Sequence, residues 1–190
     1  LLYDVQKKLE SKSAHVKFEF KYFINKKAPV SEMEFPVGYD CSFQGDLTGD
    51  DYKFILGVKV PVTTLCPCSK EISKYSAHNQ RTMIKLKVSY SENDIIWIED
   101  LVEMAERCGS SRIYSILKRC DEKYVTEKAY ENPKFVEDVL RDLICQIKNN
   151  EKITYYEAEV EAQESIHNHN AWAWQSENKL IGDKENERTI

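Results

Sequence analysis

The chain has 190 residues and a mass of 22.2 kDa, which is enough for one domain or two small joined modules and excludes a long multidomain protein. Its residues are 42% hydrophobic and 31% charged, which excludes the disordered and collagen-like classes. The net charge of -5 argues against a general nucleic-acid binder, and the apolar runs are too short to cross a bilayer. We therefore expect a cytoplasmic protein that binds neither nucleic acid nor membrane.

The first half of the chain predicts one helical turn followed by four strands. The turn covers residues 3–9. Alternation of apolar and polar residues then predicts strands. These strands lie around residues 16–24, 39–43, 54–60 and 84–90, and we expect the third to end at Pro61. Because polar residues occupy the opposite parity, the strands are expected to be antiparallel, with one face packed and the other in water.

The second half of the chain predicts helices and a final strand. Apolar residues at helical spacing predict helices over residues 98–108, 113–118 and 132–147. Gly109 is expected to close the first helix, and Asn132 to cap the last. A strand follows at 156–162, and the charged segment 177–190 is expected to fray. This order predicts an α+β fold with helices on one face of an antiparallel sheet.

The segment between the third and fourth strands carries the most reactive residues. It contains Cys66, Cys68, Lys70 and His78 in one connection, and connections on rigid sheets commonly present ligands and nucleophiles. In an extended chain the two thiols point to opposite sides, so only one of them is expected to face a given site. A structural turn with incidental thiols explains the same residues equally well.

A second informative segment follows the last strand. His167 and His169 are separated by one residue, so an extended chain places both imidazoles on one face, as in metal sites and proton relays. A solvated strand end is the alternative interpretation. His15, at a strand start, is expected to be an ordinary surface residue.

Cys, His and carboxylate side chains together can form an open metal site. Such a site typically takes three protein ligands and leaves the fourth position to water, whose pKa falls to about 7. Spacing alone does not select the third ligand, because the chain has 32 acidic residues. Zn, Mn and Fe(II) all suit this mixed set of donors.

Candidate groups for binding an anion or a base also stand out. The candidate cations are Lys70, Arg81, Lys118 and Arg119, although for each one taken alone an ordinary solvated surface residue is the favoured interpretation. Glu137 lies in the first turn of the last helix, where the helix dipole favours a carboxylate. Its two oxygens can also accept paired N–H donors from a ligand.

Several separated blocks of the sequence resemble type IB GTP cyclohydrolases. The blocks span residues 61–73, 77–81, 117–127, 132–138 and 164–169. The resemblance implies a bimodular tunnelling fold over residues 1–176, with modules of about 1–90 and 91–176. It also implies a barrel completed by oligomerisation into a homotetramer, with active sites between subunits. The implied reaction is metal-dependent hydrolysis of GTP to formate and 7,8-dihydroneopterin triphosphate for folate-type synthesis, without a nicotinamide cofactor.

The resemblance also assigns roles to individual residues. It implies that Cys66, His78 and Glu122 bind the metal and that Glu137 anchors guanine. Glu164, His167 and His169 match the rest of the catalytic pocket. Charge alone suggests that Lys70, Lys118 and Arg119 contact the phosphates. Cys120 replaces the proline expected before the Asp121-Glu122 pair, so the turn that carries Glu122 is less rigid.

Two other functions compete with this interpretation. One is a tunnelling-fold nitrile reductase of queuosine synthesis, which would use a nucleophilic Cys and a nicotinamide cofactor without a metal. The other is a non-catalytic protein that binds a structural metal. A structural site is closed by four protein ligands, whereas hydrolysis requires an open position.

Overall fold

The computed structural model describes residues 1–91 and 93–180, which form five helices and seven strands. The helices are α1 Leu2–Leu9, α2 Pro67–Ile72, α3 Ile98–Cys108, α4 Arg119–Glu131 and α5 Val136–Lys148. The strands are β1 Ser13–Lys27, β2 Glu34–Thr48, β3 Asp51–Leu65, β4 Asn79–Tyr90, β5 Ser111–Arg112, β6 Ile153–Ala162 and β7 Ala171–Asn178.

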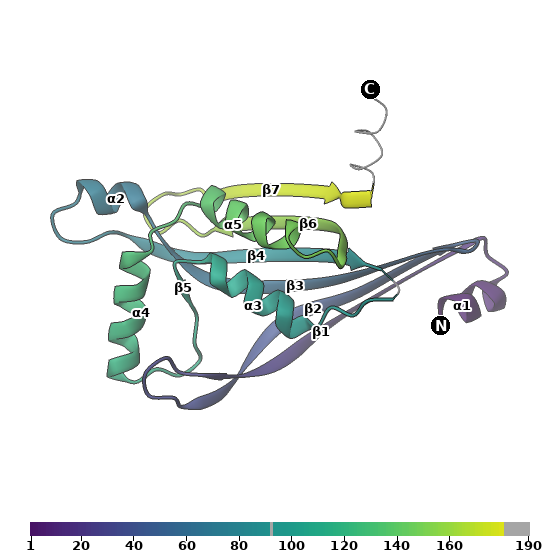
Figure 1. Cartoon of the computed structure of the whole chain (residues 1–190), viewed down its shortest axis with the longest axis horizontal. Coiled ribbons are helices and arrows are strands. Elements are labelled where there is room, and N and C mark those ends of the chain that lie inside the picture. The colour runs from purple at the N-terminus through teal and green to yellow at the C-terminus, as the bar shows by residue number, and fades with distance from the viewer. Residues whose placement is uncertain (92, 181–190) are drawn as a thin grey trace, which may run out of the picture.

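All seven strands join one antiparallel sheet, which confirms the antiparallel pairing predicted for five of them. Its order is β1-β2-β3-β4-β6-β7, and the short β5 pairs with β3. Helices α3 and α5 follow β4 and cover one face of the sheet, which confirms the α+β prediction (Figure 1). The sheet is open, with β1 and β7 at its two edges.

The core lies between the sheet and these two helices. Leu86 and Val160 are fully buried on the helix side, whereas the adjacent Lys85 and Glu159 form an ion pair on the other face. This alternation follows from the two-residue period of a strand. One sheet and one core run across residue 90, because β4 pairs with β6. The division into two modules near residue 90 therefore coincides with no break in the sheet, and it stays a prediction.

Strand β3 continues beyond Pro61, where the sequence predicts its end. Strand β2 pairs with β3 only as far as Lys59, and β5 takes over at Val62. Pro61 therefore lies between two partners, where a backbone N–H is not required for the ladder. Strand β7 is also absent from the sequence prediction, because its alternating residues are Trp and Ala rather than a clear apolar and polar pair.

The predicted helix over 113–118 is wrong, since this segment is not helical and α4 begins at Arg119. The Asp121 carboxylate accepts the backbone N–H of Lys118 at 2.9 Å, which caps the start of α4. Helix α5 begins at Val136 rather than near Asn132. The Asn132 amide donates instead to the carbonyl of Gly109 at 3.1 Å.

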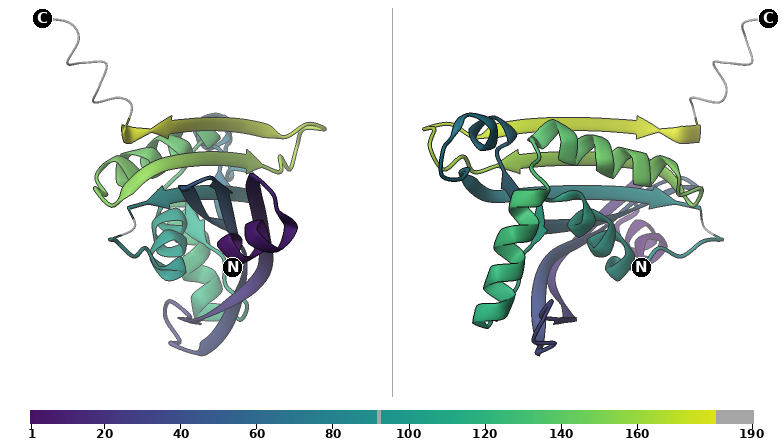
Figure 2. Two further views of the ribbon diagram at one scale, coloured as in Figure 1. Left: turned by 90° about the vertical axis from the view of Figure 1, so that its right-hand side faces the viewer. Right: turned by 60° about the vertical axis from the view of Figure 1, so that its left-hand side comes forward.

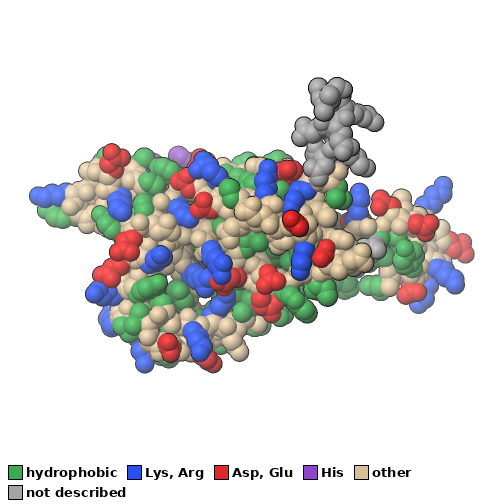
Figure 3. All heavy atoms as spheres, in the orientation of Figure 1, with side chains coloured by type: hydrophobic (Ala, Val, Ile, Leu, Met, Phe, Trp, Pro, Cys, Tyr) green, Lys and Arg blue, Asp and Glu red, His purple; other side chains and the backbone are tan. Residues whose placement is uncertain are grey.

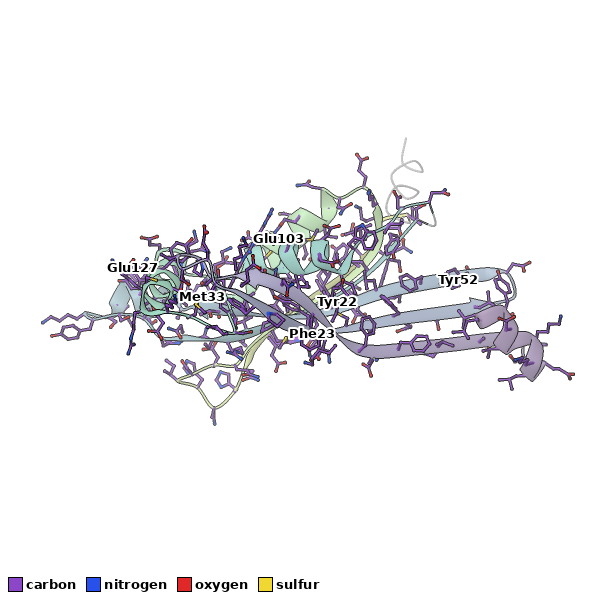
Figure 4. All side chains as sticks on the ribbon, turned by 90° about the horizontal axis from the view of Figure 1, so that it is seen from below. Tyr22, Phe23, Met33, Tyr52, Glu103 and Glu127 are labelled. Carbon is purple, nitrogen blue, oxygen red and sulfur yellow. The ribbon has the colours of Figure 1, made fainter. Side chains whose placement is uncertain are left out.

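The site region and α1 lie at opposite ends of the molecule. Helix α2 and the β6–β7 connection share one end, and α1 lies beside the far end of the β1–β2 ribbon (Figures 1 and 2). Met33 and Glu127 mark the first end and Tyr52 the other (Figure 4). The confirmed helix α1 includes the predicted turn at 3–9.

Glu177 and Asn178, the start of the expected tail, belong to β7, and residues 181–190 lie outside the described part. No helix of the described residues is long and apolar enough to span a bilayer. Positive and negative side chains are interspersed on the face seen in Figure 3.

Candidate functional site

Cys66 and His78 meet where β3 ends and β4 begins. Cys66 caps α2, with its Sγ accepting the Ser69 backbone N–H at 3.5 Å, and Pro67 occupies the first helical position. The Cys66 backbone N–H donates to the His78 carbonyl at 3.0 Å, and the His78 N–H donates to Ser69 Oγ at 3.2 Å. The chain between the two residues therefore forms a closed loop, so both lie at one end of the sheet.

The β6–β7 connection reaches the same place. Ser165 Oγ lies 3.3 Å from Nδ1 of His78, a contact between residues that are 87 positions apart. Two residues later, the rings of His167 and His169 are stacked with centroids 5.2 Å apart, and both side chains are exposed. The two sequence segments with the candidate ligands thus converge, and a hydrogen bond between His78 and Ser165 joins them.

Lys70 is held by the far end of α4. Its ammonium donates to the Tyr130 carbonyl at 2.6 Å and lies 4.4 Å from the centroid of the Tyr130 ring. A cation on an aromatic face and a charge-assisted hydrogen bond both stabilise this arrangement. Lys70 therefore joins α2 to α4 in this structure.

Lys118, Arg119 and Glu122 lie at the beginning of the same helix. Glu122 is exposed and forms an ion pair with Arg119 at 3.0 Å. It precedes Tyr130 by eight residues, which corresponds to about 12 Å along the helix axis. Among residues 1–91 and 93–180, no three His, Cys, Asp or Glu side chains gather closely enough to hold one metal ion. Within one chain, Glu122 does not join Cys66 and His78.

Glu137 lies in the exposed first turn of α5. The connection before it is bound to β3, because the Lys134 backbone N–H donates to the Leu65 carbonyl at 3.0 Å. Leu65 directly precedes Cys66, so this hydrogen bond brings the start of α5 to the site end of the sheet. The carboxylate of Glu137 is therefore available at this end.

Sequence reasoning missed Asp121, the neighbour of Glu122. Its carboxylate is fully buried and accepts hydrogen bonds from Val30 and Ser31 at 2.6 to 2.9 Å. Burial alone would raise its pKa, but these hydrogen bonds and that from Lys118 hold the pKa well below its ordinary value. Asp121 therefore joins α4 to the β1–β2 connection as an ionised clamp.

A polar groove beside α4 was also missed. It has a volume of about 430 Å³ and lies between the end of α3, β5 and α4. Its lining includes Arg112, Tyr124, Lys128 and Asn132. The Arg112 guanidinium already contacts Glu103 at 2.7 Å, so much of the positive charge of this groove is balanced within the chain.

The donors at the site fit a divalent metal in part. A thiolate and an imidazole suit Zn and other first-row metals. Nδ1 of His78 is engaged by Gln80 Oε1 at 3.0 Å and by Ser165, which directs Nε2 to be the coordinating nitrogen. Cys66 and His78 are thus the two candidate ligands that lie at this end of the sheet, and Glu122 is not brought to them in the described residues.

Sequence comparisons with a family model and with individual proteins point to the same family. Residues 1–173 match the family model described as type I GTP cyclohydrolase folE2. The chain is similar to the GTP cyclohydrolase FolE2 of Thermosipho africanus, at 53% identity over 91% of this chain and 66% of that protein. Its similarity to the FolE2 of Geotalea uraniireducens is 55% over 91% of this chain and 63% of that protein. The chain thus spans less than two thirds of the length of these relatives.

A solved structure resembles the fold. The crystal structure of uricase from Arthrobacter globiformis superposes with a TM-score of 0.50 at 7% sequence identity. The similarity covers 93% of this chain and 67% of the uricase chain. At this identity, the likeness concerns the fold alone.

Proposed function

Because the chain belongs to the type I GTP cyclohydrolase FolE2 family, we propose that it hydrolyses GTP to formate and 7,8-dihydroneopterin triphosphate, a step of folate-type synthesis. The observation that carries the proposal is the convergence of Cys66, His78 and the β6–β7 connection at one end of the sheet. These residues come from the blocks that resemble the family. The start of α5, with Glu137, lies at the same end.

Cys66 and His78 would hold a divalent metal, which is Zn, Mn or Fe(II). When bound, such a metal lowers the pKa of a coordinated water and so supplies a nucleophile at neutral pH. Glu122 is the third ligand that the family resemblance implies. Glu122 lies in the first turn of α4, whereas the last turn of α4 contacts the site through Tyr130 and Lys70. One chain alone therefore does not bring all three proposed metal ligands together. This incompleteness agrees with active sites that form between subunits.

The remaining residues of the site would bind and orient GTP. Glu137 would accept two adjacent N–H groups of guanine through its two carboxylate oxygens. Glu164, His167 and His169 would exchange protons with the ring nitrogen that leaves during opening. Lys118 and Arg119 would bind the triphosphate, whereas Lys70 would have to leave Tyr130 in order to do so.

The shape of the sheet supports the tunnelling fold and its assembly. Both edge strands, β1 with 15 residues and β7 with eight, present backbone groups that can pair with another chain. Closing several such sheets into a barrel would remove these edges. We therefore include a homotetramer with intersubunit sites in the proposal. The proposal also includes a cytoplasmic location, as expected from the sequence.

Incubation of the metal-loaded protein with GTP tests the proposed function. Formate and a pterin that becomes fluorescent after oxidation are the expected products, and the mass of the pterin product identifies it as the triphosphate. The Cys66→Ala variant should lose metal and turnover together, because it lacks the thiolate ligand. The control is Cys145→Ala, which removes an exposed thiol on α5 and should keep both.

The competing functions give different results in the same assays. A nitrile reductase would consume a nicotinamide cofactor and would tolerate a chelator, since it needs no metal. A structural metal site would bind zinc through four protein ligands and would leave GTP unchanged. Absence of turnover with Zn, Mn and Fe(II) would contradict the cyclohydrolase proposal.

A further inference from the structure

His78, Gln80 and Thr82 follow one another at every second residue into β4, so their side chains lie on one face of the sheet. On β3, Thr64 is the direct cross-strand partner of Gln80. These four residues form a continuous chain of hydrogen bonds. It leads from the exposed end of the sheet into the core.

Hydrogen-bond distances define this chain at each step. His78 Nδ1 lies 3.0 Å from Gln80 Oε1, and Gln80 Nε2 donates to Thr64 Oγ1 at 3.1 Å. The hydroxyls of Thr64 and Thr82 are 2.7 Å apart, and the two residues are 1% and 0% exposed. Leaving a buried hydroxyl without a hydrogen-bond partner costs free energy of folding. The hydrogen bond between Thr64 and Thr82 therefore anchors the buried end of this chain of hydrogen bonds.

The direction of these bonds decides the protonation of the His78 ring. The Gln80 amide directs its nitrogen to Thr64, so its carbonyl oxygen faces His78. An amide oxygen only accepts hydrogen bonds, so its contact with Nδ1 places the proton of the neutral imidazole on that nitrogen. The Ser165 hydroxyl, 3.3 Å from the same nitrogen, can donate or accept and therefore favours neither tautomer. The lone pair is then on Nε2, the ring nitrogen that takes no part in this chain of hydrogen bonds.

We propose that Gln80 is a positioning residue that holds His78 in the Nδ1–H tautomer and so prepares Nε2 to bind a metal ion. The inference rests on the proposed function only in assigning His78 to a metal. Histidine ligands usually donate their other ring N–H to a fixed acceptor, and loss of that acceptor typically weakens metal binding 10- to 100-fold. In this protein the acceptor is the side-chain amide of Gln80, which is itself anchored in the core.

The first test is the tautomer of His78 in the zinc-free protein, read from the ¹⁵N chemical shifts of its ring nitrogens. The wild-type protein should show the Nδ1–H form. In Gln80→Leu this preference should be lost, and in Gln80→Glu it should be retained, because a carboxylate also accepts from Nδ1–H. An Nε2–H form in the wild-type protein would overturn the proposal.

The second test is zinc affinity, measured by competition with a chromophoric chelator. We expect Gln80→Leu to bind zinc 10- to 100-fold more weakly and Gln80→Glu to bind it within a few-fold of wild type. The matched control is Gln44→Leu, the same change on β2 near the opposite end of the sheet, which should leave zinc affinity unchanged. An unchanged affinity in Gln80→Leu would also overturn the proposal.

Neither readout depends on GTP turnover. A protein that shows the Nδ1–H tautomer and the Gln80 effect but produces no formate would refute the proposed function and leave this inference intact. If Gln80→Leu does not fold, the wild-type tautomer and the behaviour of Gln80→Glu still decide the question.

Discussion

Gly109 follows α3 in an extended conformation, with φ -73° and ψ 169°. These angles are open to any residue, so glycine is not required here for a left-handed turn. A Cβ at this position would lie 2.6 Å from Cβ of Val62, which is fully buried. The next residue, Ser110, donates its backbone N–H to the Thr63 carbonyl at 2.8 Å. The close approach of this segment to β3 therefore excludes a side chain.

Substitution of Gly109 by Ala should destabilise the protein by about 1–3 kcal/mol, because Val62 or the end of α3 must move. Urea denaturation measures this change. The control is Gly38→Ala in β2, where a Cβ would meet only side-chain atoms of Lys21 and Phe23, which can shift. We expect a much smaller effect there. Equal losses in both variants would contradict the packing argument.

At the scale of the elements, α5 is held by one buried stripe. Val139, Leu143 and Ile147 recur every four residues and are each fully buried against the sheet. The residues of this stripe pack against β6, while Cys145 lies on the exposed side of the helix. Because α5 begins with Val136 and Glu137, this packing also determines where the carboxylate proposed to bind guanine is presented.

Leu143→Ala should lower the free energy of unfolding by about 2–5 kcal/mol, because it removes buried methyl groups and leaves a cavity. The neighbouring Cys145→Ala change should cost far less, since this side chain is exposed. Denaturant unfolding of both variants provides the comparison. A small effect of Leu143→Ala would show that α5 does not depend on this stripe.

At the scale of the whole molecule, ionised carboxylates join segments that are distant in sequence. Asp121 joins α4 to the β1–β2 connection, and Glu103 joins α3 to Arg112 of β5. Burial raises the pKa of Glu103, but the hydrogen bond and charge of Arg112 outweigh this effect and lower it. The hydrogen bond from Lys85 lowers the pKa of Glu159 on β6.

These lowered pKa values predict a loss of stability in acid. A carboxyl group with a lower pKa in the folded state contributes stability above its unfolded pKa, about 4.5 for Glu, and loses it as the pH falls through the folded value. The thermal midpoint should therefore be nearly level from pH 7 to 5 and should fall towards pH 3. Glu159→Gln should reduce the size of this fall. A midpoint that rises on acidification would contradict the prediction.

The sequence by itself determined the strands and helices whose signals are local. In β1 to β4 and β6, the two-residue period of the sequence shows which residues face the core. Helices α3 and α5 follow from apolar residues at helical spacing. Both patterns depend only on near neighbours in the chain. The sequence also singled out Cys66 and His78 as residues with candidate chemistry. Their 12-residue separation spans one connection, so their meeting required little long-range information.

Only the tertiary structure decided features that depend on contacts between distant segments. The start of α4 depends on Asp121 and its partners in the β1–β2 connection, and the continuation of β3 through Pro61 depends on where β2 and β5 end. The contact of His78 with Ser165 likewise requires β4 and β6 to be paired, and the contact of Gln80 with Thr64 requires β3 and β4 to be paired. Sequence patterns do not encode such contacts, because hydrogen bonding and close packing depend on which segments become neighbours in space.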